Sequence, residues 1–418
     1  MAGVAEVYLP AFALALGMPP VLAGLVATAP LLAGGLLQLL APRAIAKLAS
    51  LRRWVVGCVI VQALSFVPLI VVALYGTLAS PIVFGSSALY WAAGMGASAG
   101  WNPWMARVVP EKIRGKFFGR RQGLVQATML AGLIAAGAGL HGVARVHVLD
   151  VYACMFAIAF VARMWCAFML SRMGEGVDVS PRRRMRLRSI PHKLRGTPRA
   201  SLLAYLVVAG SAATISGAFV TPYLLHHVRL DYASYALFTA LIVISKIVFS
   251  APLGRLMQRV GVRRVLSGCA LGIAPIPLMY MASDWYPWLL FIQFYGGIVW
   301  GGFELGALIA LFDGDDDGER TTLQVAYGAL QAVGNASASF VGGALLASLG
   351  SGQVAYLWVF LVSAIARLLA ALLIVKNLPR LIVRLPATII VGAWTLAIRP
   401  WGGTIVRPFI EGISRWRK

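Results

Sequence analysis

The chain has 418 residues, of which 60% are hydrophobic and only 12% are charged, and its mean hydropathy is +0.82. Soluble globular proteins carry about 25% charged residues, so this composition excludes an ordinary soluble domain. The formal net charge of +23 would suggest a nucleic-acid partner in a soluble chain, and only the positions of the basic residues can decide that question.

Apolar segments follow one another along the whole sequence, and most are long enough to cross the roughly 30 Å hydrocarbon layer of a bilayer as helices. Lipid offers no hydrogen-bond partner to the backbone, so spanning segments must satisfy their own amides and carbonyls. The first segment is short for a span. We predict twelve transmembrane helices at residues 2–17, 21–41, 54–75, 82–106, 122–141, 149–171, 202–225, 232–254, 265–282, 286–312, 323–349 and 353–375.

The basic residues gather in alternate loops. Most of the 37 Lys and Arg residues lie in 42–53, 107–121, 172–199, 255–264 and the tail after 375, whereas the intervening loops hold only Arg145 and Arg229. This alternation follows the positive-inside rule, which predicts a multi-pass protein of the cytoplasmic (inner) membrane with both termini cytoplasmic. The charge therefore indicates topology and contact with anionic headgroups, and no nucleic-acid partner is expected.

The two halves of the chain repeat one another. Arg163, Arg114 and the pair Arg52-Arg53 recur as Arg367, Arg320 and Arg263-Arg264, at offsets of about 204 to 211 residues. Internal repeats of this kind are typical of secondary transporters. We predict a six-helix bundle at 1–171, a basic cytoplasmic linker at 172–199, a second six-helix bundle at 200–376, and a basic cytoplasmic or interfacial tail at 377–418.

The loop between the predicted helices eight and nine carries the sharpest motif. It reads GRLMQRVGVRR and resembles the GxxxDRxGxRR loop of the major facilitator superfamily, through Gly254, Gln258, Arg259, Gly261, Arg263 and Arg264. Gln258 stands at the position of the family's Asp. In the first half only Arg52 and Arg53 match. The resemblance implies that these residues latch helix ends together when the cytoplasmic side is closed; alternatively, the arginines only fix topology.

A second match follows the fourth predicted helix, where PEKIRGKFFG resembles the family's PxxxRGxxxG stretch. It contains Arg114, and Gly115 and Gly119 lie four residues apart, a spacing that lets helices approach closely. The resemblance covers roughly residues 1–376. It implies an all-α membrane fold of twelve transmembrane helices in two pseudo-symmetric six-helix bundles, and no motif in it specifies a substrate.

Ionisable residues within the predicted spans are Glu6, Arg163, Lys246, Glu304 and Arg367. A charge at mid-bilayer costs about 2.5–3.5 kcal/mol on insertion scales, so each needs a reason. In the family fold, helices one and ten line the central cavity, which makes Glu6 and Glu304 candidates for proton coupling. The alternative is an ion pair to a nearby arginine that locks helices together. Lys246 is a candidate for contact with substrate or an anion, and we expect Arg163 and Arg367 to be structural, extending toward the cytoplasmic surface.

The same helix assignment gives polar and aromatic candidates for the cavity. They are Trp101, Asn102, Tyr223, Tyr295 and Trp300, with Gln126 and Asn335 on helices five and eleven. Each is weighed against a plain role in packing or in a hydrogen bond between helices. The acidic run after residue 312 and the scattered histidines lack the spacing of a metal site, so no metal and no cofactor are expected.

Two functions remain open at this stage. The favoured one is a secondary transporter that moves a small molecule or ion by alternating access, as a monomer in the lipid bilayer, with proton coupling as an option that the carboxylates leave open. The other is a sensor or membrane scaffold that uses the same fold without transport. The sequence has no nucleotide-binding motif and no catalytic cluster, so we do not expect an enzyme.

Overall fold

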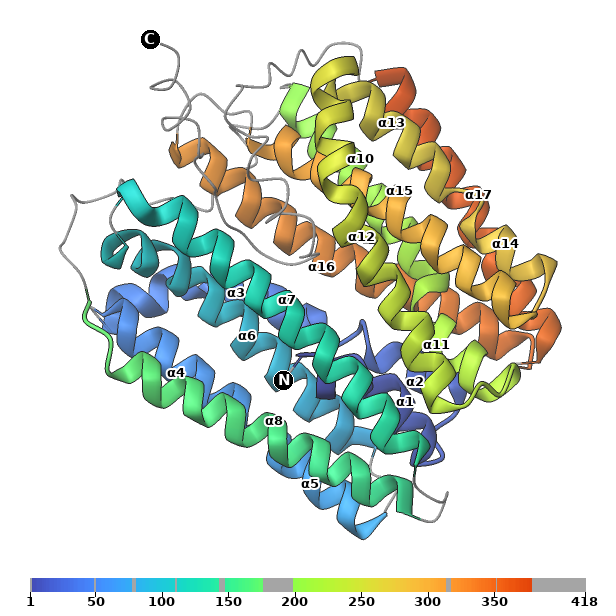
Figure 1. The fold of residues 1–418 in the computed structure, drawn as a ribbon, viewed down its shortest axis with the longest axis horizontal. Coiled ribbons are helices and arrows are strands. Elements are labelled where there is room, and N and C mark those ends of the chain that lie inside the picture. The colour runs from blue at the N-terminus through green and yellow to red at the C-terminus, as the bar shows by residue number, and fades with distance from the viewer. Residues whose placement is uncertain are drawn as a thin grey trace.

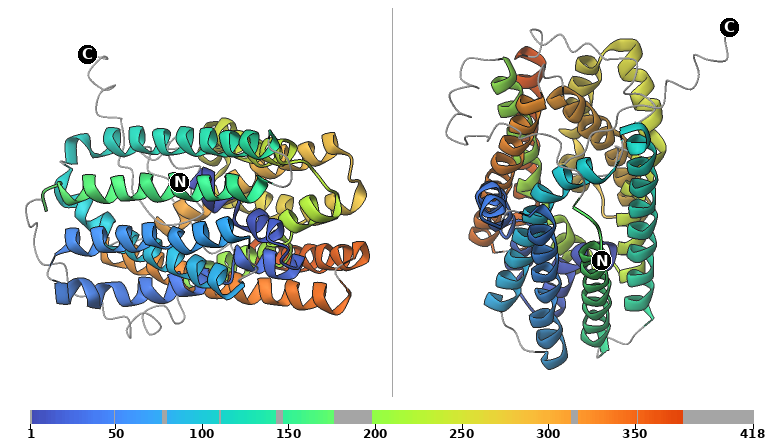
Figure 2. Two further views of the ribbon diagram at one scale, coloured as in Figure 1. Left: turned by 90° about the horizontal axis from the view of Figure 1, so that it is seen from below. Right: turned by 90° about the vertical axis from the view of Figure 1, so that its left-hand side faces the viewer.

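The structure is a computed structural model of the chain and describes residues 2–48, 50–76, 80–109, 111–142, 147–175, 198–312, 317–350 and 352–377. This part of the chain is built from helices, which form two bundles that lie side by side (Figure 1). Most helices in both bundles run roughly parallel to one another (Figure 2). The predicted linker beyond residue 175 and the predicted tail beyond 377 lie outside the described residues.

The first bundle is blue to green in Figure 1. Its elements are η1 (Ala2–Glu6), α1 (Leu9–Ala15), α2 (Pro20–Val26), α3 (Leu31–Leu48), α4 (Leu51–Leu64), α5 (Phe66–Tyr75), α6 (Ser80–Val108), α7 (Glu111–His141) and α8 (Val148–Ser171). Helix α6 packs against α3 and α4, and α8 packs against α4 and α5.

The second bundle runs from green through yellow to red. It contains α10 (Pro198–Gly217), α11 (Val220–Pro222), η4 (Tyr223–His227), α12 (Tyr232–Val260), α13 (Val262–Ile273), α14 (Ile276–Ala282), α15 (Tyr286–Phe312), α16 (Asp317–Ser348) and α17 (Gln353–Asn377). Helix α15 packs against α12 and α13, while α10 packs against α16 and α17.

The helices coincide with the predicted apolar segments, several of which are broken into consecutive pieces. Within the described residues, nine stretches are long and apolar enough to span a membrane, and Gly3–Ala15 and Ala127–His141 are shorter apolar helices. The fold is therefore that of a multi-pass all-α membrane protein, and the total of twelve spans stays a prediction.

Prolines explain three of the helix breaks. Pro30 precedes α3, Pro68 lies in the first turn of α5, and Pro277 lies in the first turn of α14. Proline has no N–H and its ring clashes with the carbonyl four residues earlier, so it interrupts the helical hydrogen-bond ladder. Pro277 thereby leaves the carbonyl of Ile273 without an N–H partner in its own helix. A side chain from another helix can donate to that carbonyl instead.

The two bundles meet along α7 with α12, and along α2 and α3 with α16. Small residues allow close approach. A Cβ added at Gly137 on α7 would lie 2.2 Å from the Cβ of Ala236 on α12, and one at Gly24 would lie 2.5 Å from the ring of Phe219. Both contacts are near the end of the molecule that carries His141 and Asp231, which we call the His141 end. The bundles are therefore joined closely at this end.

Gly261 connects α12 to α13 and explains one glycine of the loop motif. Its φ of 94° lies in the left-handed region, where a side chain is disfavoured. The turn at this point therefore depends on a glycine, independently of any role of the neighbouring arginines.

Close packing inside the second bundle makes a testable prediction. A Cβ at Gly342 on α16 would lie 2.2 Å from the carbonyl oxygen of Ile215 on α10, so Gly342→Ala should force the helices apart and cost about 1–3 kcal/mol. A Cβ at Gly57 meets nothing within 4 Å, and Gly57→Ala should instead stabilise by about 0.5–1 kcal/mol. Apparent melting temperatures of the purified variants measure both signs; equal shifts would contradict the packing.

Candidate functional site

Lys246 on α12 and Glu304 on α15 form a salt bridge inside the second bundle. Lys246 Nζ donates to Glu304 Oε1 at 2.7 Å, and the two side chains are 14% and 20% exposed. The other carboxylate oxygen, Oε2, is buried and has no hydrogen-bond partner. The alternative expected for Glu304 was an ion pair to an arginine; the structure shows an ion pair, but its cation is Lys246.

Two glycines bring these charges together. A Cβ at Gly297 on α15 would lie 2.8 Å from the carbonyl oxygen of Ile242, and one at Gly301 would lie 3.6 Å from the Cα of Lys246. Residues four apart share one helix face, so Gly297 and Gly301 form a smooth surface on which α12 rests. The side chain of Glu304, one turn further on, then reaches Lys246.

The salt bridge lies one helix away from the contact between the bundles. Tyr327 on α16 is within electrostatic range of Glu304. The next residue, Gly328, faces the first bundle, because its added Cβ would lie 3.3 Å from Oε1 of Gln38 on α3. Helix α16 therefore connects the ion pair to the contact between the two bundles.

Polar atoms without partners follow the same helix. Buried oxygens of Gln38, Ser211 and Gln331 make no hydrogen bond in the structure. Gln331 Nε2 donates to Asn335 Oδ1 at 2.5 Å, and Ser211 lies against Gly334. Buried polar atoms in native proteins are almost always satisfied by protein, water or ligand. These three oxygens, on α3, α10 and α16, are therefore available to water or to a polar solute. Asn335 is among the residues predicted from the sequence, whereas Gln38, Ser211 and Gln331 are not.

Glu6 occupies a different position, in the first bundle. Tyr90 on α6 donates to Glu6 Oε2 at 2.6 Å. The short element η1 is held against α7, since an added Cβ at Gly3 would lie 2.0 Å from the carbonyl oxygen of Met129. The structure thus does not bring Glu6 and Glu304 into one site; each belongs to its own bundle.

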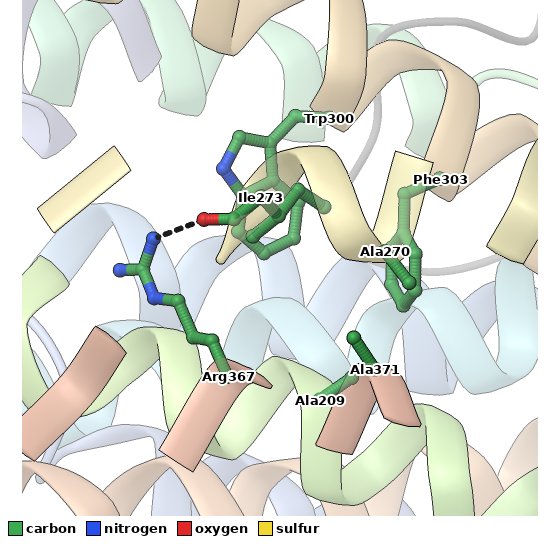
Figure 3. A pocket seen from close by; sticks show the side chains of 7 residues that line it. All are labelled: Ala209, Ala270, Ile273, Trp300, Phe303, Arg367 and Ala371. Atoms are coloured by element: carbon green, nitrogen blue, oxygen red, sulfur yellow. Dashed lines mark hydrogen bonds between the residues drawn. The ribbon is translucent and has the colours of Figure 1, made fainter. Parts of the chain in front are cut away.

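Arg367 on α17 is almost completely buried, 7% exposed, and joins three helices. Its Nη2 donates to the carbonyl of Ala213 and the hydroxyl of Ser216, both at 3.0 Å, and its Nε donates to Ser363 at 3.2 Å. Its Nη1 donates to the carbonyl of Ile273 at 3.4 Å, the group that Pro277 leaves free (Figure 3). All of these acceptors are neutral.

A small cavity of about 10 Å³ adjoins Arg367, with room for about one water molecule. Figure 3 shows that apolar side chains make up most of its wall. Its lining residues are Ala209, Ala270, Ile273, Trp300, Phe303, Arg367 and Ala371. The size and apolar lining make it a packing defect of the second bundle rather than a solute site.

Arg163 repeats this arrangement in the first bundle. It lies on the last helix of its bundle, as Arg367 does, and its Nη2 donates to the side-chain oxygen of the buried Gln62 on α4. Its Nε is buried without a partner. The expectation that both arginines extend to the surface is wrong for Arg367, because carbonyls and hydroxyls of neighbouring helices satisfy the guanidinium inside the bundle.

The aromatic candidates have structural contacts. Tyr223 is buried at the His141 end and donates to Asp284, and Tyr295 donates to the carbonyl of Gly272 at 2.8 Å. The Trp101 ring lies 4.2 Å from the guanidinium carbon of Arg121, and Trp300 lines the small cavity. The side chains of Asn102 and Gln126 lie outside the described residues.

The loop arginines serve different parts of the structure. Arg52 donates to the carbonyl of Met173 at 3.2 Å and lies 3.8 Å from Glu175, so the start of α4 is fastened to the segment after α8. Arg53, Arg259 and Arg264 are exposed, Arg263 is half-buried, and Gly254 is buried. The side chains of Arg114, Gln258 and Arg320, and the surroundings of Gly115 and Gly119, lie outside the described residues.

The His141 end carries an ion pair between the bundles. Nδ1 of His141 at the end of α7 lies 3.0 Å from Oδ2 of Asp231, and that carboxylate also caps α12 by accepting from the amides of Ala233 and Ser234. Tyr8 packs edge-on against Tyr235 nearby. In the described part of the chain, no three His, Cys, Asp or Glu side chains gather as a metal site would require.

The family comparison matches the second half of the chain. The model described as Major Facilitator Superfamily matches residues 201–410. A search of curated proteins found no significant match.

Solved transporter structures share the fold at low sequence identity. An auto-inhibited peptide transporter of the POT family has a TM-score of 0.70 and 12% identity, covering 93% of this chain and 96% of that one. A mutant of the nucleoside transporter NupG has a TM-score of 0.67 and 11% identity, covering 90% and 96%. A D-xylose–proton symporter has a TM-score of 0.62 and 16% identity, covering 86% and 88%. At these identities the likeness establishes the fold alone.

Arg367 should not tolerate replacement by lysine. A lysine ammonium lacks the planar fork that reaches acceptors on three helices, and each buried acceptor left unpaired costs about 1–3 kcal/mol. We expect Arg367→Lys to lower the melting temperature of the purified protein strongly, while Arg264→Lys, on an exposed side chain, should leave it nearly unchanged. Equal melting temperatures for the two variants would argue against the buried network.

Asp231 should stabilise the protein in a pH-dependent way. Hydrogen bonds from Ser234, first from its side chain and then from its backbone, together with His141, lower the pKa of Asp231. A lowered pKa means that the stabilisation is complete above the unfolded value of about 3.9 and is lost as the pH falls through the folded value. Removing this helix cap with Asp231→Ala should cost about 1 kcal/mol at pH 7.

The measurement is the difference in melting temperature between parent and Asp231→Ala across pH 3 to 8. The difference should shrink below about pH 4, where the parent also loses the charged cap. Asp150→Ala is the matched control, since Asp150 pairs with His147 within three residues of the same chain segment and joins no bundles. A difference that grows as the pH falls below about 4 would refute the assignment.

Proposed function

Because the chain belongs to the major facilitator superfamily, we propose that it is a secondary transporter that moves a small solute by alternating access. Membership makes it a membrane transporter and not an enzyme. The proposal adds the mechanism: the two bundles rock against each other around a site near the contact between them. Its division into bundles 1–171 and 200–376, with the linker 172–199 and the tail 377–418, is part of the proposal.

The proposed orientation follows from the loop charges. We propose that the His141 end lies outside the inner membrane and both termini lie in the cytoplasm, and the positions of the basic loops support this orientation. In this orientation the outer side is closed by three contacts between the bundles: Gly137 with Ala236, Gly24 with Phe219, and His141 with Asp231. The conformation described would be inward-facing. We also propose that the protein acts as a monomer.

The salt bridge between Lys246 and Glu304 carries the proposal of proton coupling. A pair that only locked helices together would satisfy both carboxylate oxygens, whereas Oε2 of Glu304 is buried and has no partner. That oxygen can accept a proton, which would weaken the attraction to Lys246. Since α16 links the pair to the other bundle, a change in the pair can alter the contact between bundles.

A labelling experiment tests alternating access without knowledge of the solute. In a background lacking the native cysteines, Ala236→Cys lies beneath Gly137 and should react with a membrane-impermeant maleimide only when the outer side opens. A disulfide between His141→Cys and Asp231→Cys, formed before labelling, should suppress the reaction, and reduction should restore it. Trp285→Cys, at a residue that is 68% exposed, is the control that reacts in every state.

The same assay tests coupling. In a His141→Gln background, which removes the imidazole that bridges the bundles, the labelling rate of Ala236→Cys should change between pH 5.5 and 8. Adding Glu304→Gln should abolish that change. If Ala236→Cys never reacts, the outer side does not open and the proposal of alternating access falls. If the pH response survives in Glu304→Gln, Glu304 is not the coupling group.

A further inference from the structure

We propose that the transported solute is a small organic monoanion, of the monocarboxylate class, which replaces Glu304 as the partner of Lys246 when Glu304 takes up a proton. The inference rests on the proposed function and adds to it the substrate class and the stoichiometry. It starts from the charge balance of the pair. Separated charges in a low-dielectric interior are costly, so every state of the transport cycle favours a site that is neutral overall.

Two states of the site are neutral. In one, the ammonium of Lys246 pairs with the carboxylate of Glu304, as the structure shows. In the other, Glu304 carries a proton, and the ammonium pairs with the carboxylate of the solute. One proton and one monoanion therefore enter together and leave together, with no net charge moved by the pair. A neutral solute would leave the ammonium without a counter-charge, and a dianion would leave a negative charge.

The geometry of Glu304 suits this exchange. Only Oε1 contacts Lys246, and the two side chains keep 14% and 20% exposure although both residues lie within apolar spans. Oε2 can receive the proton without breaking an existing hydrogen bond. The unpartnered oxygens of Gln38, Ser211 and Gln331, along α16 and its neighbours, provide polar atoms for the remainder of a solute that also carries hydroxyl or amide groups.

The charged residues of the other spans also favour an anionic solute. The described spans and the short first helix contain, away from their ends, three cationic side chains and two carboxylates. The cations are Arg163, Lys246 and Arg367, and the carboxylates are Glu6 and Glu304. Arg163 and Arg367 bond only to neutral groups, and Glu6 accepts from Tyr90. The interior thus has an excess of positive charge, whose potential in a low-dielectric medium favours anions over cations.

Other titratable groups near Glu304 are few. Helix α12 contributes Lys246, and α16 contributes Tyr327, which is close enough to the carboxylate to interact with it electrostatically. Of the other packed elements, α13 carries Arg263 and Arg264 in its first turn and Cys269, which lies against Gly302. The described part of α10 carries Tyr205, and α14 carries Tyr280, which stacks on Phe360. Lys246 is therefore the charged group that responds directly when Glu304 is protonated.

The test compares acids with their own amides. Purified full-length protein is heated with straight-chain monocarboxylates of two to eight carbons and their 2-hydroxy derivatives, and separately with the matching primary amides, at pH 5.5 and pH 8. We expect at least one acid to raise the melting temperature at pH 5.5 where its amide does not. Its apparent affinity should be lower at pH 8 than at pH 5.5, by at most about tenfold per pH unit, because one proton binds together with each anion.

Three variants assign the effect. Glu304→Gln should bind the same acid equally well at both pH values, because Lys246 then has no competing carboxylate. Lys246→Met should lose the response, and Lys246→Arg, which keeps the charge, should retain it. If Lys246→Met does not fold, the loss of pH dependence in Glu304→Gln together with the retained response of Lys246→Arg decides the question.

The inference is overturned if no acid stabilises the protein more than its amide, or if the response persists in Lys246→Met. These failures differ from a failure of the proposed function. When Ala236→Cys labelling reports two states that respond to pH through Glu304, but no acid is preferred over its amide, the transporter proposal stands and the monoanion proposal falls. When labelling reports a single state, the proposed function falls first.

Discussion

Lipid gives a polar group no partner, and this constraint shapes the molecule at each level. It requires the backbone to be helical wherever the chain crosses the membrane. It also requires each ionisable side chain within the spans to find its partner among neighbouring helices. Lys246 and Glu304 meet this requirement by pairing with each other, Glu6 by accepting from Tyr90, and Arg367 by donating to neutral oxygens.

The hydrogen bonds of Arg367 depend on the interruption of a helix at Pro277. Pro277 interrupts the helical ladder and leaves the carbonyl of Ile273 without an N–H partner. Arg367 supplies that partner from α17 and binds Ala213 and Ser216 on α10 with the same guanidinium. One buried cation therefore fastens α10, α13 and α17 together. Helix α15, which carries Glu304, packs against this assembly at α13, and its Trp300 and Phe303 line the small cavity beside Arg367.

The two halves resemble each other in the side-chain hydrogen bonds of their arginines as well as in sequence. Arg163 and Arg367 both lie on the last helix of a bundle and both reach the helix that follows the first basic loop of that bundle. The halves differ where function is proposed, because the buried salt bridge belongs to the second bundle, which is also the part that the family model matches. The first bundle contributes its face to the contact, through α3 and α7.

Composition and hydrophobic length by themselves determined the class of protein and the approximate positions of the helices, because both are local properties of the chain. The pairing of the two halves stays a prediction from the arginine spacing. Composition and hydrophobic length also singled out Glu304, Lys246 and Arg367 as charges that needed a reason. Which groups meet was decided only by tertiary structure. The contact of Lys246 with Glu304 depends on Gly297 and Gly301, which let α12 approach α15, and the partners of Arg367 are neutral groups that carry no sequence signal. Side-chain pairing between helices depends on how each helix is rotated about its axis and on how far apart the helices lie. Neither can be derived from the sequence of one segment.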